Sequence, residues 1–257
     1  MRIVSLVIRQ LRYTNRAFWR NPAAAFFTIA FPLMFLVIFT TLFGRGELDI
    51  NGNLVSPATF YVPAIAVFSA ISACYSNVAM SLIVARERGV LKRIKATPLP
   101  GGAYLASRIL HAVLIALVLV GVCALFGAVF YDATLPVRSL PAFLVTLSIG
   151  SACFCALGTA VTTIVPNADA APAIVNATFL PLLFVSDIFI PLQDPAPWVA
   201  FIGDVFPFKH FSTAMQHAFF PVDGSLGFTP SSLAVMGAWG LGGLLVAVRR
   251  FTWEPRR

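Results

Sequence analysis

Six long apolar stretches divide the chain, and polar segments of very different charge separate them. The stretches run approximately Pro22–Phe43, Phe60–Ala85, Ser107–Tyr131, Leu140–Val165, Ala170–Leu192 and Ser231–Val248. Crossing about 30 Å of hydrocarbon takes roughly 20 apolar residues in a helix, a length that these stretches approach or exceed. Because a backbone in lipid must satisfy its own N–H and C=O groups, all six are predicted to be helical spans. The pattern predicts a single all-α polytopic membrane domain over residues 1–257.

The basic residues predict the orientation of these spans. Fifteen of the 18 Lys and Arg residues fall before the first span, around the loop between the second and third, or after the sixth. The other three, Arg45, Arg138 and Lys209, lie in the alternate loops. An even number of spans puts the three basic segments on one face, and the positive-inside rule makes that face cytoplasmic. We therefore expect a bacterial inner-membrane protein with both termini inside.

The net charge of +8 has its explanation in the same loops. Juxtamembrane basic residues set orientation and face anionic lipid. Membrane lipid is thus an expected partner, and nucleic acid is not.

The N-terminal segment, residues 1–21, has the pattern of an amphipathic helix. At 100° per residue its five arginines fall within an arc of about 80°, with apolar residues on the broad opposite face. This pattern is typical of a helix lying in the membrane interface. The alternative is a basic N-terminus that only orients the first span.

The loop between the second and third spans also predicts a short amphipathic helix. Val90, Leu91 and Ile94 group on one side, and Glu87 projects among them with no basic residue four positions later. One interpretation is a helix that docks into the groove of a partner protein. The other is a solvated basic loop that only obeys the positive-inside rule, and the pattern alone leaves both open.

This loop resembles the signature R-E-x-G-x-L-x-x-x-x-x-T/S-P-L of the type-2 permeases of ATP-binding-cassette (ABC) transporters, the membrane subunits of drug and polysaccharide exporters. The matching residues are Arg86, Glu87, Gly89, Leu91, Pro98 and Leu99. The resemblance extends over nearly the whole chain and implies that the loop is a coupling helix seated in a separate ATPase subunit. The coupling residues that it implies are Arg86, Glu87, Gly89, Val90, Leu91, Lys92, Ile94 and Pro98. It also implies two ATPase copies and a second permease copy or paralogue as partners.

A second resemblance lies at the outer end of the fifth span. Ser186, Asp187 and Pro191 are similar to the family's S-G-x-x-x-P exit, with Asp187 in place of the usual glycine, and Pro207 is similar to a later proline step. The resemblance implies a re-entrant outer segment before the last span. Asp187, Pro191 and Pro207 are therefore candidate exit or gate residues. For Asp187 the alternative is a hydrated aspartate that caps this segment.

The other polar residues of the spans suggest structural roles. Asn77, Asn176 and Thr178 are interpreted as residues that hydrogen-bond between helices. The four cysteines all fall inside spans and are interpreted as small buried side chains, with neither a disulfide nor a metal site.

The motifs missing from the sequence bear on the mechanism. No G-x-x-x-x-G-K-[ST] loop occurs, so the chain has no phosphate cradle of that kind, and no H-E-x-x-H or paired-carboxylate motif occurs. We expect no catalytic, cofactor or metal site here, and ATP hydrolysis on a partner chain. The favoured function is export of a hydrophobic drug or lipid-like molecule. An ion-coupled carrier or, less well supported, an intramembrane enzyme are the alternatives.

Overall fold

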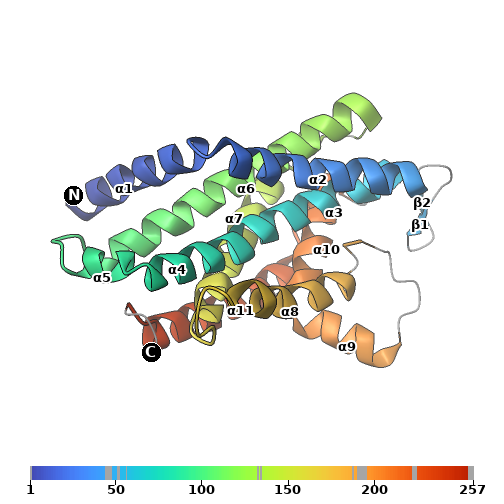
Figure 1. The fold of residues 1–257 in the computed structure, drawn as a ribbon. Helices are drawn as coiled ribbons and strands as arrows, with labels where there is room; N and C mark the ends of the chain where they lie inside the picture. The colour runs from blue at the N-terminus through green and yellow to red at the C-terminus, as the bar shows by residue number, and fades with distance from the viewer. Residues whose placement is uncertain are drawn as a thin grey trace.

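Helices make up almost all of the structure, a computed structural model, and several of the long ones, among them α2, α3 and α6, share one general direction (Figure 1). It describes residues 2–43, 48–50, 53–55, 57–131, 133, 135–186, 188–189, 196–221 and 225–253. The helices are α1 (Arg2–Trp19), α2 (Pro22–Phe43), α3 (Pro57–Ile71), α4 (Asn77–Glu87), α5 (Val90–Lys95), α6 (Gly101–Tyr131), α7 (Leu140–Val161), α8 (Ala171–Phe184), α9 (Pro197–Val205), α10 (Pro207–Phe219) and α11 (Pro230–Arg250). A π-helical turn, η1 (Ser72–Ser76), joins α3 to α4. The prediction of an all-α membrane protein is confirmed except for one small hairpin, β1 (Leu48–Ile50) with β2 (Asn53–Val55).

Among the described residues, five helical segments are long and apolar enough to cross a membrane. They are Ala25–Leu42 within α2, Pro57–Glu87 over α3, η1 and α4, and the helices α6, α7 and α11. These five agree with the first, second, third, fourth and sixth predicted spans. The structure ends α7 at Val161 rather than Val165, because Thr162 and Thr163 turn their hydroxyls back onto the carbonyls of Thr159 and Ala160.

The fifth predicted span, Ala170–Leu192, is not one continuous helix. Helix α8 has 14 residues and ends at Phe184. The Ser186 hydroxyl donates to the Leu182 carbonyl, a local bond that competes with continuation of the helix. A continuous helix over this stretch is therefore not confirmed, because composition predicts apolarity well and predicts the end of a helix poorly.

The core is centred on α3. Nearly every residue of α3 is buried, and the largest fully buried side chains there are Tyr61, Ile65 and Ile71. A helix that is apolar all round is expected in such a central position. Helices α2 and α11 are mostly exposed and lie at the periphery.

Glycines on α7 and α11 allow close helix contacts. A Cβ added at Gly158 would lie 2.6 Å from the Tyr75 carbonyl oxygen on η1, and one at Gly240 would lie 3.2 Å from the Cys153 Cα. Small residues at these positions allow backbones to approach, as is common in membrane helix packing. Helix α7 is therefore held between η1 on one side and α11 on the other.

Helix α1 is amphipathic, as predicted, but the structure does not place it across the bundle. It packs along α6 and leads into α2 in the same general direction (Figure 1). The side that carries the buried Thr14 and the half-buried Phe18 faces the bundle, and Arg9, Arg12 and Arg16 are exposed. The expected in-plane position is therefore not confirmed.

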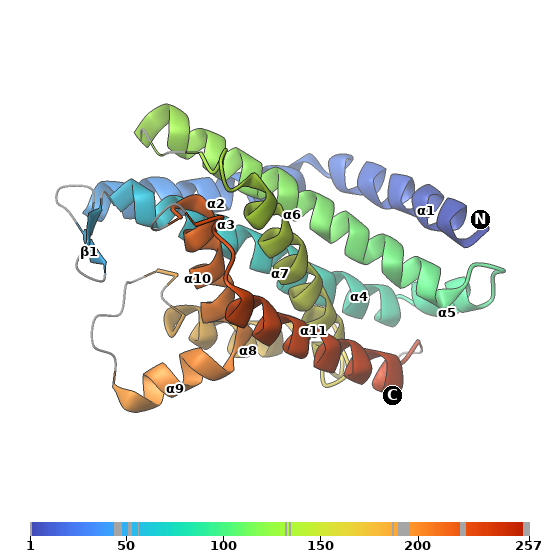
Figure 2. The ribbon, with the colours of Figure 1, turned by 180° about the vertical axis from the view of Figure 1, so that it is seen from behind.

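The two ends of the chain lie at the same end of the bundle. The N-terminus, α5 and the C-terminal end of α11 are together there, and the β1–β2 hairpin and α9 lie toward the other end (Figures 1 and 2). The clusters of basic residues on α1, α5 and α11 therefore lie at one end.

Candidate functional site

A groove lined by phenylalanine side chains opens between α2, the α3–η1 segment and α8. We call it the aromatic groove, and its volume is about 550 Å³. Its aromatic lining comprises Phe27, Phe31, Phe35, Phe68, Phe179, Phe184 and Phe189. The rings contact one another in a chain, with centroid distances of 4.8 Å for Phe31–Phe35, 5.7 Å for Phe35–Phe68 and 5.4 Å for Phe68–Phe189. Such offset and tilted pairs suit binding of a large apolar molecule.

The groove carries a limited polar edge and no charge among its described lining residues. The polar side chains are Thr28, Ser69, Ser72, Ser76, Asn77 and Asn176. Asn77 and Asn176 are both exposed, and no hydrogen bond to either is present in the described part of the chain. The prediction that they bond between helices is therefore wrong, because both amides face the groove instead. For Thr178 it is confirmed, since its Oγ1 lies 2.7 Å from the Tyr75 hydroxyl.

The short helix predicted in the loop after Glu87 is present as α5, and Gly89 makes the turn before it. Gly89 has φ = 68°, a left-handed conformation that L side chains rarely adopt. This turn ends α4 and starts α5 at an angle. The side chain of Leu91 then points inward and is fully buried, while Val90 is 37% exposed. Leu91 is thus a core residue of this chain, and of the two side chains only that of Val90 is exposed to a partner.

Arg86 also points inward. It is only 3% exposed, and its guanidinium donates to the carbonyls of Thr162 at 2.9 Å and Val165 at 2.6 Å. These carbonyls lie just past the end of α7, where a helix leaves backbone acceptors unpaired. A cation at a helix C-terminus is further favoured by the helix dipole. The guanidinium therefore joins the end of α4 to the turn between α7 and α8.

Glu87 makes the complementary contact. Its carboxylate accepts a hydrogen bond from the backbone N–H of Ala168, three residues before α8 begins. Glu87 has no basic residue four positions later, and its partner here is a backbone N–H from a loop distant in sequence. We call these two residues the Arg86–Glu87 pair, and together they attach α4 and α5 to the α7–α8 turn.

The surface left on and beside α5 is basic. Arg88, Lys92, Arg93 and Lys95 are exposed there, and Pro98 is exposed just beyond the helix. Ile94 is half-buried and packs against the core. Of the predicted coupling residues, Val90, Lys92 and Pro98 therefore face outward, and Arg86, Leu91 and Ile94 face inward.

Of the three candidate exit residues, Pro207 lies within the described part of the chain. Asp187 and Pro191 lie outside the described residues. Pro207 is buried at the first position of α10, where a missing N–H costs nothing. The corner before it is held by the Trp239 indole N–H, which donates to the Val205 carbonyl at 2.7 Å, and by a Lys209–Asp204 ion pair at 2.8 Å.

The described residues include no group of three or more His, Cys, Asp and Glu side chains that could hold a metal ion. All four cysteines are buried and free, which confirms their interpretation as core side chains. Sequence reasoning missed the aromatic groove. A signal was present, because Phe27, Phe31 and Phe35 recur every four residues and so share one face of α2.

Comparison with known proteins agrees with a transport role. One relative is the daunorubicin resistance ABC transporter permease protein DrrB1 of Streptomyces coeruleorubidus, 27% identical over 249 residues, covering 93% of this chain and 82% of that protein. Another is the putative transport permease YvfS of Bacillus subtilis (strain 168), 23% identical over 197 residues, covering 76% of this chain and 77% of that protein. The putative transport permease ycf38 of Cyanophora paradoxa is 28% identical over 195 residues, covering 74% of this chain and 66% of that protein.

A model of the family described as ABC-2 type transporter matches residues 3–220, which include the aromatic groove, α5 and the Arg86–Glu87 pair. With relatives that are permeases and five apolar helices of spanning length, the chain is a multi-pass membrane permease subunit of an ABC transporter, and it belongs to the ABC-2 type transporter family.

Proposed function

We propose that this chain is the membrane-spanning subunit of an ATP-driven exporter that moves a hydrophobic small molecule out of the cell. The observation that carries the proposal is the aromatic groove, which is large, apolar and uncharged among its described lining residues. The printed name of one relative refers to resistance to a drug, which is consistent with export. ATP would be hydrolysed on a separate chain.

The groove lining also favours this function over an ion-coupled carrier. Such carriers usually need ionisable side chains or unwound helices around an ion site. The groove offers hydroxyls, two amides and aromatic rings instead. Its open side lies along α2 and α8, where Phe27 and Phe184 are strongly exposed, so we propose that a second permease copy or a paralogue covers it.

For topology we propose six passes with both termini in the cytoplasm of a bacterial cell. Five crossings alone would leave the two ends of the chain on opposite sides. Support for a sixth comes from the ends lying together (Figure 1) and from α8, which is apolar but only 14 residues long. The segment after Phe184 would complete that crossing, and α9 and α10 would form the outer segment before α11.

We propose that the ATPase docks on the exposed basic surface of α5, with two ATPase copies serving two permease chains. Movement of α5 would pass through the Arg86–Glu87 pair to the α7–α8 turn. That turn leads directly into α8, which supplies Asn176, Phe179 and Phe184 to the groove. This connection offers a physical route from ATPase movement to a change in groove shape.

Blocking the groove tests the substrate path. Asn176→Trp would place a large side chain in the opening, and export of a hydrophobic fluorescent dye from cells should fall strongly while expression stays normal. Leu125→Trp is the matched control, because Leu125 is 60% exposed on α6 and does not line the groove. Normal export by the Asn176 variant would place the path elsewhere.

A paired substitution tests ATPase docking. Lys92→Gln with Arg93→Gln removes two exposed charges from α5, and co-purification of the ATPase should weaken with ATP-dependent export. Arg249→Gln with Arg250→Gln removes two exposed charges from α11 at the same end of the bundle and should leave both unchanged. Equal loss in the two variants would point to general charge rather than a docking site.

Thiol labelling tests the orientation. A single cysteine at Asn51 in a cysteine-free background should react with an impermeant reagent added outside intact cells. A reporter fused after Arg257 should be active only as a cytoplasmic fusion. Labelling at Asn51 only after cell lysis would invert the proposed topology.

The role of Asp187 remains a prediction. If this carboxylate only caps an outer segment at a hydrated interface, Asp187→Asn should leave export near that of the natural protein. Loss of export with normal ATPase activity would assign Asp187, with Pro191 and Pro207, to the exit.

A further inference from the structure

A second, polar pocket lies between α1, the η1–α4 segment and α6, and we call it the polar pocket. Its volume is about 370 Å³, within the range of small-ligand sites, about 300–1,000 Å³. The polar and titratable side chains that line it are Gln10, Tyr13, Thr14, Asn77, Ser81, Arg108 and His111. No Asp or Glu lines it among the described residues, and Arg108 and His111 are the lining side chains there that can carry positive charge.

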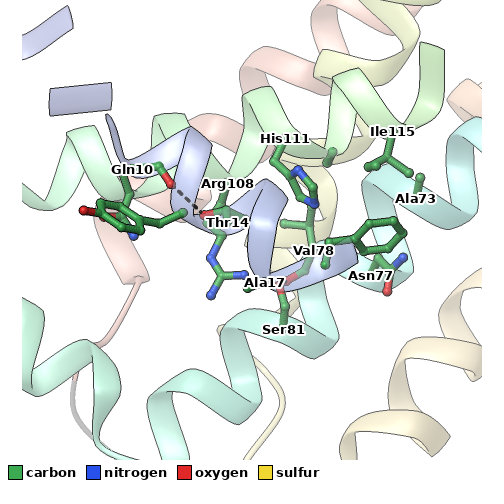
Figure 3. Close-up of a pocket in the computed structure, with 13 residues that line it drawn as sticks. Gln10, Thr14, Ala17, Ala73, Asn77, Val78, Ser81, Arg108, His111 and Ile115 are labelled. Carbon is green, nitrogen blue, oxygen red and sulfur yellow. Dashed lines mark hydrogen bonds between the residues drawn. The ribbon is translucent and has the colours of Figure 1, made fainter. Parts of the chain in front are cut away.

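Arg108 and His111 both extend from α6 toward the part of α4 that carries Asn77 and Ser81 (Figure 3). The Nε and Nη2 of Arg108 donate to the Tyr104 hydroxyl at 3.1 and 2.9 Å. A guanidinium has five N–H donors, so this one neutral acceptor leaves its charge uncompensated and other donors available. Planar guanidinium groups bind phosphate oxygens especially well.

Two further polar groups are available to a ligand in this pocket. The Nδ1 of His111 is buried and has no hydrogen-bond partner in the described part of the chain, an arrangement that folded proteins usually avoid. The Phe18 ring lies edge-on to the imidazole, with centroids 5.5 Å apart. A ligand oxygen at Nδ1 would satisfy this nitrogen, and Asn77 lines this space as well as the aromatic groove.

The position of the pocket indicates an amphiphile. Arg108 and His111 lie in the first third of α6, near the end of the bundle that carries α5 and the N-terminus. Phe18, Ala73, Val78 and Ile115 supply an apolar wall beside the polar groups. On α1, exposed Arg9 and Arg16 stand one turn before and after Tyr13 and add basic side chains at the rim. Such a pocket combines a cationic floor with apolar walls, as an anionic amphiphile requires.

We propose that the polar pocket binds an anionic phospholipid of the cytoplasmic leaflet, with its phosphate on Arg108 and its acyl chains leaving past Phe18 and Ile115. The lipid would fill the gap between α1 and the η1–α4 segment. Ala73 and Asn77 line both this pocket and the aromatic groove. A lipid bound in the pocket would therefore contact residues that also form the wall of the groove. The lining of the polar pocket includes Arg108 and His111, whereas the described lining of the aromatic groove is uncharged, so the two sites suit different ligands. The assignment to the cytoplasmic leaflet rests on the orientation proposed above.

Native mass spectrometry of the purified permease with phosphatidylglycerol or phosphatidylcholine tests this proposal without ATP or ATPase. The protein should retain phosphatidylglycerol in preference to phosphatidylcholine. Arg108→Gln should lower phosphatidylglycerol affinity about tenfold or more, as expected for loss of a charge-assisted hydrogen bond. Arg108→Lys should keep most of the affinity. Arg138→Gln, which removes an exposed arginine in the loop before α7, should bind as the natural protein does.

A second variant, which fills the pocket, separates loss of lipid binding from misfolding. Ala17→Trp fills the pocket from an exposed position on α1, and should abolish the lipid preference while thermal stability without lipid stays unchanged. Phosphatidylglycerol should raise the unfolding temperature of the natural protein but not of this variant. Equal retention of the two lipids, or equal loss in the Arg138 control, would overturn the proposal. Binding of inorganic phosphate with no lipid preference would reassign the pocket to a free anion and also overturn it. The lipid-binding measurement does not depend on export, so failure of the proposed export function would not change its outcome.

Discussion

The Arg86 guanidinium lies 2.6 Å from the Val165 carbonyl oxygen, although 79 residues separate the two in sequence. This contact joins the end of the second span to the turn that starts α8. It makes Arg86 part of the connection between α5 and the aromatic groove rather than a surface charge.

Replacing Arg86 by alanine should destabilise the protein. The change leaves two buried carbonyls without their charged donor, which costs about 2–4 kcal/mol in the free energy of unfolding. Thermal unfolding in detergent measures this, and export should fall even where the ATPase still co-purifies. The exposed neighbour is the control: Arg88→Ala should change stability by less than about 0.5 kcal/mol. Similar effects at the two positions would contradict the inward role of Arg86.

Replacing Gly89 by alanine should destabilise the protein through backbone strain and not through a steric clash. Its φ of 68° costs an L residue about 1–2 kcal/mol, although an added Cβ would meet no atom within 4 Å. Gly89→Ala should therefore lower the unfolding temperature and weaken ATPase co-purification by shifting α5. Gly102 also has free space around its Cβ position but lies in helix α6, so Gly102→Ala should be neutral or slightly stabilising. A neutral Gly89 variant would show that the turn relaxes easily.

Gly158 should be intolerant for steric reasons. Its Cβ would lie 2.6 Å from the Tyr75 carbonyl oxygen and 2.9 Å from the Tyr75 Cα, both of which are backbone atoms that yield little. Overpacking of this kind typically costs about 1–3 kcal/mol. Gly158→Ala should lower the unfolding temperature accordingly, whereas Gly121→Ala on α6, with nothing within 4 Å, should not. No difference between these two variants would mean that α7 and η1 separate at little cost.

Removing either partner of the Tyr75–Thr178 hydrogen bond should lower the free energy of unfolding by a different amount. The Thr178 hydroxyl has a backbone carbonyl in reach as acceptor, that of Val175 at 2.9 Å, so the Tyr75 hydroxyl is the donor between them. Thr178→Val should then cost more than Tyr75→Phe, because it leaves a mostly buried hydroxyl hydrogen without an acceptor. We expect about 1–3 kcal/mol for the first and about 0.5–1.5 kcal/mol for the second. A double-mutant cycle measures the coupling, and a coupling near zero would mean that the bond is absent in the membrane.

The sequence by itself determined the helical spans and their grouping. Long apolar runs have one stable form in lipid, so the positions of α2, α6 and α11 follow from composition. The distribution of basic residues predicted that α1, α5 and the C-terminus lie together, and they do in the structure (Figure 1). The short helix α5 was also predictable, since Gly89 and Pro98 bound a helical pattern on either side.

Only the tertiary structure decided which way the side chains of that loop face. Arg86 belongs to a basic run and so has the pattern of an orientation signal, yet it is buried because unpaired carbonyls past the end of α7 come within its reach. Leu91 is buried because the Gly89 turn swings α5 against the core. The aromatic groove and the polar pocket likewise combine elements far apart in the chain. The local sequence pattern shows which residues share one face of a helix. Burial and hydrogen-bond partners depend instead on which distant segment of the chain packs beside that helix.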